Sequence, residues 1–179
     1  MKQRPHGFTL IELMTVTAVL GISLAVGVPT FSHVRKNARI SNAYHLLTTS
    51  LASARITAVS RGMPVSLCPS RDGRQCRKDL IWQDGWILFL DPGRKGAPAD
   101  TTAILQRFDP LGPDVAVRTT PGRHWIRYLP SGRSTGTNLS LWICSPHDGH
   151  RIGRVAIGNS GRARSERDSG PAVPCSYAP

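Results

Sequence analysis

The chain has 179 residues, with 23 lysines and arginines against 11 aspartates and glutamates, so its formal net charge is +12 at neutral pH. Only four of the 23 basic residues are lysines; the arginine bias favours a polyanionic partner, because a guanidinium group matches phosphate oxygens, although a G+C-rich genome would also enrich arginine. The sequence has no G-x-S-x-G motif, no phosphate-binding loop and no paired-carboxylate signature, so we expect no catalytic residues, no cofactor and no enzyme.

The N-terminal region begins with a short basic leader, residues 1–7, followed by a mostly apolar run, residues 8–29. A helix of about 20 apolar residues can cross the hydrocarbon core of a bilayer, so the run predicts a transmembrane or filament-core helix. Glu12 lies inside this run, where a carboxylate is costly and usually marks function. A secretory signal peptide cleaved near residues 25–27, or a plain membrane anchor, would explain the length and the basic start but not Glu12.

The segment G-F-T-L-I-E-L, which begins at Gly7, resembles the N-terminus of type IV pilins and pseudopilins. The resemblance implies that a prepilin peptidase cleaves after Gly7 and methylates the new amine on Phe8. It also implies that Glu12 pairs with the N-terminal amine of a neighbouring pilin during filament assembly, which supplies the partner that a charge in a membrane requires. Pro29 stands where this family commonly has a proline, and it is expected to kink the helix.

Residues 30–61 continue the helical pattern as an amphipathic half. One apolar stripe recurs at steps of three and four residues, and it consists of Val34, Leu47, Leu51, Ala54 and Ala58. The sequence R-G-M-P at 61–64 is expected to end the helix, because it combines a glycine and a proline. We therefore predict one helix from Phe8 to about Ser60, whose second half packs on the domain that follows.

Residues 62–164 alternate short apolar runs with turn residues, which predicts a β-rich globular domain. The candidate strands are Val65–Cys68, Trp86–Leu90, Ala103–Phe108, Val115–Thr119, Trp125–Leu129, Leu139–Cys144 and Arg154–Ile157. The predicted fold class is α+β, with a long N-terminal helix packed on an antiparallel β-sheet or small β-sandwich. The polar tail, residues 165–179, is expected to be irregular and held by a disulfide.

The cysteines are Cys68, Cys76, Cys144 and Cys175. An even number in an exported domain indicates two disulfides, and sequence alone leaves three pairings open. We favour the local pairs Cys68–Cys76 and Cys144–Cys175. A metal site is the alternative, since His147 and His150 follow Cys144 at ligand-like spacing, but the paired close spacings of structural zinc sites are missing. We expect no metal.

The globular half is similar to the GspH/FimT branch of pseudopilins and minor pilins. The similarity rests on V-S-L-C-P-S-R-D-G from Val65, W-Q-D-G-W-I-L-F-L-D from Trp82 and I-G-N-S-G-R-A-R from Ile157. It implies a single-pass protein of the inner membrane with a periplasmic C-terminal domain. Such a protein is then incorporated into a pilus, at or near the tip, where its partners are other minor and major pilins.

The sharpest candidate site is the motif Gly161-Arg162-Ala163-Arg164. In an extended segment, side chains two residues apart point to the same face about 7 Å apart, close to the spacing of successive phosphates. Some FimT-type minor pilins bind DNA through a C-terminal G-R-x-R motif, which implies phosphate contacts by Arg162 and Arg164. Further candidates rest on charge and proximity in the sequence alone, and these are Arg133, Arg151, Arg154 and Arg167.

The sequence therefore predicts a minor type IV pilin that binds double-stranded DNA and assists its uptake in natural transformation as well as pilus biogenesis. We expect contacts to the phosphate backbone without sequence preference, because the sequence shows no recognition helix. The alternative is a structural, GspH-like minor pseudopilin of a type II secretion system with no nucleic-acid role. In that case the arginines would face solvent or acidic pilin neighbours.

Overall fold

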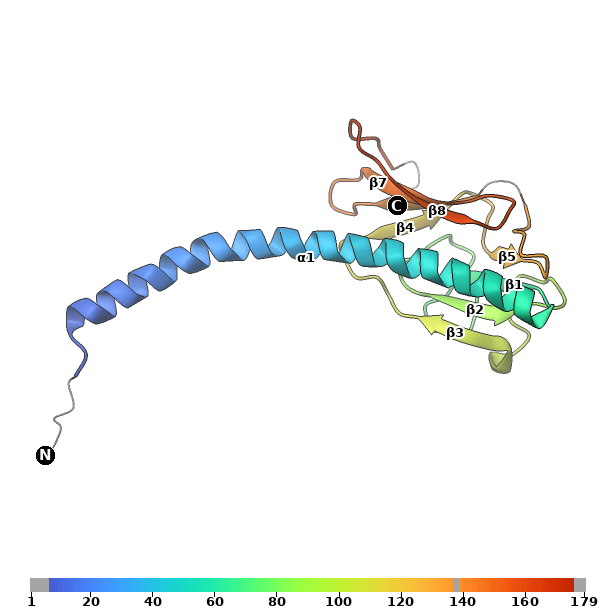
Figure 1. The fold of residues 1–179 in the computed structure, drawn as a ribbon, viewed down its shortest axis with the longest axis horizontal. Helices are drawn as coiled ribbons and strands as arrows, with labels where there is room; N and C mark the ends of the chain where they lie inside the picture. The colour runs from blue at the N-terminus through green and yellow to red at the C-terminus, as the bar shows by residue number, and fades with distance from the viewer. Residues whose placement is uncertain (1–6, 137–138, 176–179) are drawn as a thin grey trace, which may run out of the picture. The chain divides into compact units, whose positions relative to one another are not determined.

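The computed structural model describes residues 7–136 and 139–175, without the side chains of residues 26, 28–30, 32 and 33. The predicted leader, apart from Gly7, lies outside these residues. One long helix precedes a short 3₁₀ turn and eight β-strands (Figure 1). The chain divides into two units, residues 1–38 and residues 39–179, which are described separately.

Helix α1 spans Leu10–Arg61, close to the predicted limits. It begins after Thr9, whose hydroxyl accepts a hydrogen bond from the backbone N–H of Glu12 at 3.3 Å. It ends where Gly62 takes a positive φ of 61°, as a helix-terminating glycine commonly does. Among the described residues, no helix is long and apolar enough to cross a membrane, so the span predicted over residues 8–29 is not confirmed.

The part of α1 that belongs to the second unit carries four of the five residues of the predicted apolar stripe. Leu47, Leu51, Ala54 and Ala58 are buried, whereas Val34, assigned to the same stripe, is 58% exposed. The buried residues join one core with side chains from both sheets. Burial of this stripe stabilises the amphipathic half, because most helix stability in proteins comes from such packing.

The globular domain contains two antiparallel four-stranded sheets, which confirms the predicted α+β fold. Sheet A has the order β3-β2-β1-β5, with β1 Val65–Pro69, β2 Trp86–Leu90, β3 Ile104–Phe108 and β5 Ile126–Tyr128. Sheet B has the order β4-β6-β7-β8, with β4 Ala116–Thr119, β6 Leu139–Cys144, β7 Arg151–Ile157 and β8 Ala163–Arg167. The 3₁₀ turn η1, Thr101–Ala103, precedes β3.

Strand β8 corrects the prediction that the chain becomes irregular at residue 165. It pairs antiparallel with β7 from Ala163, opposite Ile157, to Arg167, opposite Gly153, and it forms an edge of sheet B. The sequence A-R-S-E-R lacks the apolar alternation by which a strand is recognised. Pairing with β7, rather than local propensity, therefore determines that this segment is a strand.

Both favoured disulfides are present, Cys68–Cys76 and Cys144–Cys175. The second holds the segment that follows β8 against the start of β7, where the Arg151 N–H donates to the Val173 carbonyl at 2.8 Å. Cys144 is thus not available as a thiolate ligand for a metal. Within residues 7–136 and 139–175, no group of three or more His, Cys, Asp and Glu side chains could hold a metal ion.

Candidate nucleic-acid interface

The turn between β7 and β8 places the G-R-x-R motif at the edge of sheet B. The Gly161 N–H donates to the Gly158 carbonyl at 2.8 Å, and Gly161 has a φ of +75°. A Cβ on Gly161 would lie 2.0 Å from the carbonyl oxygen of Gly132 in a neighbouring turn. Arg55 of α1 donates from Nε to that same oxygen at 2.9 Å. The first residue of the motif is therefore glycine because the backbone of another turn packs directly against it.

Arg162 and Arg164 are both exposed, and both line one open groove together with Arg154 of β7. Arg162 also borders a second hollow beside α1. The alternation of side chains along an extended segment puts residues 162, 164 and 166 on one face. Arg164 stands opposite Ala156 of β7. Within the described part of the chain, neither guanidinium forms a hydrogen bond or an ion pair, so both are available to an external anion.

The predicted residues Arg151 and Arg154 lie on the same face but already have partners. Arg154 Nε donates to Glu166 Oε2 at 2.7 Å, and Arg151 pairs with Asp168. The two guanidinium groups also stack on Trp142 of β6, 4.9 Å (Arg151) and 5.3 Å (Arg154) from its ring centroid. No spacing in the sequence could place Trp142 here, because its position comes from the pairing of β6 with β7.

Arg167, also predicted to belong to the site, does not lie with Arg162 and Arg164. Its guanidinium donates to Ser41 Oγ of α1 at 2.9 Å and lies 5.3 Å from the ring centroid of Tyr44. Burial raises the pKa of Tyr44 to about 12, an effect that the nearby Arg167 charge opposes. Residue 167 falls on the other face of the alternation from residues 162 and 164, so its side chain turns toward α1. A DNA contact by Arg167 stays a prediction.

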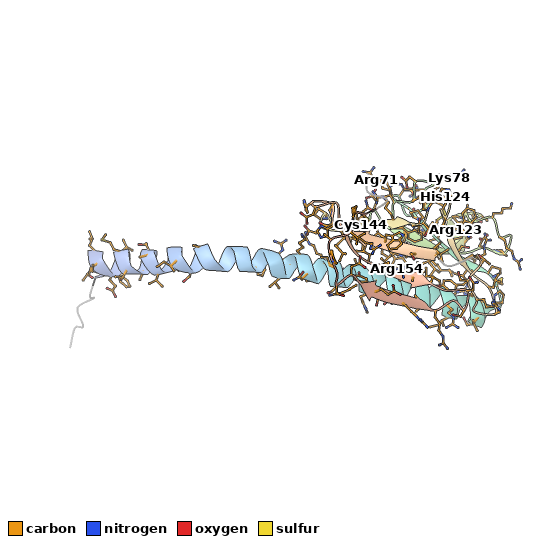
Figure 2. The ribbon with its side chains drawn as sticks, turned by 90° about the horizontal axis from the view of Figure 1, so that it is seen from above. Arg71, Lys78, Arg123, His124, Cys144 and Arg154 are labelled. Atoms are coloured by element: carbon orange, nitrogen blue, oxygen red, sulfur yellow. A yellow bond between two sulfur atoms is a disulfide. The ribbon has the colours of Figure 1, made fainter. Side chains whose placement is uncertain are left out.

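Arg133 is exposed and follows Gly132, the residue whose carbonyl contacts Gly161. The structure thus places it beside the motif, as proximity in sequence alone could not show. In the view of Figure 2, Arg154 lies over the strands of sheet B, whereas Arg71 and Lys78 lie at the far edge of the domain.

The open groove beside the motif has a volume of about 330 Å³. Its lining residues are mostly small or basic, and they are Ser140, Arg154, Ala156, Ile157, Gly158, Ser160, Arg162, Arg164 and Glu166. Ala156 stands between Ser140 of β6 and Arg164 of β8 in the strand register. The small residues Ala156 and Ser140 therefore lie next to Arg164, and the groove also contains Arg154, Arg162 and the acidic Glu166.

The predicted N-terminal site residues lie at the start of the chain's described part. Gly7 and Phe8 precede α1, and Phe8 is 88% exposed. Glu12 lies in the first helical turn, three residues after the capping Thr9. This T-x-x-E spacing is typical of a capping box, and the helix dipole favours a negative charge at this end. We did not predict the Thr9 cap, although the T-x-x-E spacing is present in the sequence.

The long N-terminal helix, its G-F-T-L-I-E motif and the two antiparallel sheets define a type IV pilin-like protein, a class that is structural rather than catalytic. The family model described as type II transport protein GspH matches residues 43–161, and the model of the prokaryotic N-terminal methylation motif matches residues 2–28. The chain belongs to the GspH family.

Solved structures of similar fold include the type IV minor pilin FimU of Pseudomonas aeruginosa in two crystal forms. One gives a TM-score of 0.57 at 21% identity, covering 74% of this chain and 96% of FimU. The other gives 0.60 at 19% identity, covering 76% and 94%. The fimbrial protein EcpB of Eikenella corrodens is 34% identical over 70 residues, 39% of this chain, and the match spans only 43% of that relative's length.

Proposed function

We propose that this protein is a minor pilin of a type IV pilus and that it binds double-stranded DNA without sequence specificity through Arg162 and Arg164. The observation that carries the proposal is the contrast within sheet B. Arg151 and Arg154 are paired with carboxylates, whereas Arg162 and Arg164 are exposed and unpaired among the described residues. Unpaired guanidinium groups can bind phosphates without first breaking an internal ion pair.

The expected contacts are with the phosphate backbone. Side chains two residues apart on a strand are separated by about 7 Å, so Arg162 and Arg164 can reach successive phosphates. Arg133 adds a third cation beside the motif. Binding of this kind is electrostatic, with dissociation constants on the order of micromolar or weaker that rise steeply with salt. Such contacts would retain incoming DNA during uptake without selecting its sequence.

The N-terminal segment supports a role as a filament subunit. We propose that a prepilin peptidase cleaves after Gly7 and methylates Phe8, that the segment inserts in the inner membrane, and that the mature protein joins other pilins at or near the pilus tip. Glu12 would pair with the amine of a neighbouring subunit. Mass spectrometry of protein recovered from its host tests the first step: a mature N-terminus at methylated Phe8 is expected, and an intact leader would contradict it.

The DNA-binding proposal is tested by titrating labelled double-stranded DNA with the full-length protein, kept in solution by a mild detergent, at low salt. In Arg162→Gln/Arg164→Gln we expect affinity to fall by about tenfold or more, because two phosphate contacts are lost. The matched control is Arg71→Gln/Arg74→Gln, which removes the same charge from two exposed arginines of the β1–β2 connection. Equal losses in both variants would contradict a defined site.

The second candidate is a minor pseudopilin of a type II secretion system, which the match to the type II transport protein GspH family favours. In that function, Arg162 and Arg164 would contact acidic neighbours in the pseudopilus rather than DNA. Absence of DNA binding by the unaltered protein would favour this second function.

A further inference from the structure

We infer that the groove beside Arg162 and Arg164 seats a single phosphodiester backbone, and that Glu166 limits its affinity by holding Arg154. This inference rests on the proposed function, because it concerns the same anion and the same face of sheet B. It adds a further cation (Arg154), serine hydroxyl donors, and a residue of this chain that weakens binding.

The residues that line the groove have the chemistry that binding of a phosphate strand requires. The volume of the groove is about 330 Å³, and its small residues include Ala156 and Gly158. Ser140 and Ser160 also line it, and serine hydroxyls commonly donate to phosphate oxygens. Arg162 and Arg164 come from the β8 side, whereas Arg154 comes from β7. A backbone in the groove would therefore meet cations from two strands.

Glu166 forms an ion pair with Arg154, the cation that β7 contributes to the groove. Its Oε2 accepts from Arg154 Nε at 2.7 Å, and the two side chains are 47% and 39% exposed. An ion pair with this much exposure to solvent is weak, so a phosphate can compete with Glu166 for the Arg154 guanidinium. Glu166 itself lines the groove and would repel the same phosphate. Its charge thus opposes binding in two ways, by occupying Arg154 and by direct repulsion.

Trp142 keeps Arg154 in place when Glu166 is removed. The Arg154 guanidinium lies 5.3 Å from the Trp142 ring centroid, within the range of a cation–π contact. The guanidinium would remain at the groove without its carboxylate, and its freed donors would face the groove.

The neighbouring pair Arg151–Asp168 provides a matched control. It also joins an arginine to a carboxylate, and the Arg151 guanidinium lies over the same Trp142 ring, 4.9 Å from its centroid. Neither Arg151 nor Asp168 lines the groove. Removing the Asp168 charge therefore makes the same change in net charge as removing the Glu166 charge, but outside the inferred seat.

The test compares Glu166→Gln and Asp168→Asn in the full-length protein, titrated into labelled double-stranded DNA at several salt concentrations. We expect Glu166→Gln to tighten binding about threefold to tenfold and to steepen the salt dependence by about one released ion. Asp168→Asn should change the affinity by less than about twofold. The double variant Arg154→Gln/Glu166→Gln should lose most of the gain, because the freed cation is then absent.

The outcomes separate the inference from the proposed function. In one outcome, Arg162→Gln/Arg164→Gln abolishes binding while Glu166→Gln and Asp168→Asn have the same affinity for DNA. That result would overturn the inferred phosphate site in the groove and leave the proposed function standing. A gain that survives Arg154→Gln would overturn the role given to Arg154. If the unaltered protein, Glu166→Gln and Asp168→Asn all fail to bind DNA, the proposed function fails and the inference fails with it.

Discussion

Sheet A and sheet B use arginine in opposite ways. In sheet A, Arg127 of β5 is buried and its guanidinium binds the Asp91 carboxylate, with 2.8 Å between the charged atoms. At the edge of sheet B, Arg164 of β8 and Arg162 just before β8 are exposed and, among the described residues, have no partner. The net charge counts all three arginines equally. The comparison teaches that a basic composition predicts an anion-binding surface only where the arginines do not already form ion pairs with carboxylates.

The largest effect on stability is expected from breaking the Arg127–Asp91 ion pair of sheet A. Asp91 also accepts from Ser66 Oγ at 2.8 Å and from the backbone N–H groups of Lys95 and Gly96. Asp91→Ala leaves the Arg127 charge buried and unpaired, so it should lower the free energy of unfolding by about 3–5 kcal/mol. Arg162→Gln/Arg164→Gln should change it by less than about 0.5 kcal/mol. Thermal unfolding measures both, and equal shifts would contradict the comparison.

The two disulfides sharpen the comparison, because one lies beside each sheet. Cys144–Cys175 joins residues 31 apart, and Cys68–Cys76 joins residues 8 apart. The longer loop restricts the unfolded chain more, so replacing each pair with serine should lower the unfolding free energy by about 3.5 and about 2.5 kcal/mol, respectively. Chemical denaturation of the two double variants measures the difference. A larger loss at Cys68–Cys76 would contradict the loop-length account.

A substitution at Gly161 tests how the backbone holds the unpaired residues Arg162 and Arg164 in position. Gly161→Ala places a Cβ 2.0 Å from the Gly132 carbonyl oxygen in a residue with positive φ, and it should lower the unfolding free energy by about 2–3 kcal/mol. Gly122→Ala is the control, since Gly122 has a φ of +77° but nothing within 4 Å of its Cβ position. Its smaller loss, about 1 kcal/mol, isolates the backbone strain. Equal losses in melting experiments would show that the packing of Gly161 on Gly132 is unimportant.

The smallest effect concerns an ion pair between α1 and the loop before β4. Asp114 accepts from Arg39, and the guanidinium holds the pKa of that carboxyl below its usual range. Because its pKa in the folded protein is lowered, this contribution to stability is present at neutral pH and is lost as pH falls through about 4 and below. Melting temperatures of the unaltered protein and Asp114→Asn should differ slightly at pH 6 and converge near pH 3. A constant difference would refute the assignment.

Much of the fold could be predicted from the sequence, because its signals are local. The apolar stripe of α1 and the R-G-M-P stop predicted the end of the helix to within a residue. Strands β2 and β6 have the predicted limits. The strand β8 could not be predicted, because its polar residues are extended only through pairing with β7.

The candidate site was predictable in part. The shared face of Arg162 and Arg164 follows from the alternation of an extended segment, and the same rule applied one step further would have placed Arg167 on the other face. The partners of Arg151 and Arg154 could not be found in this way. Asp168 and Glu166 follow them by 17 and 12 residues, and only the antiparallel register brings them together.

The central claim is that the unpaired residues Arg162 and Arg164, at the edge of sheet B, contact DNA phosphates. The most direct measurement is the slope of log affinity for double-stranded DNA against log salt concentration, in the unaltered full-length protein and in Arg162→Gln/Arg164→Gln. Each lost phosphate contact lowers the slope by about 0.9, so the account predicts a slope shallower by about 1.8 in the variant. An unchanged slope would contradict it, because Arg162 and Arg164 would then displace no counterions from the DNA.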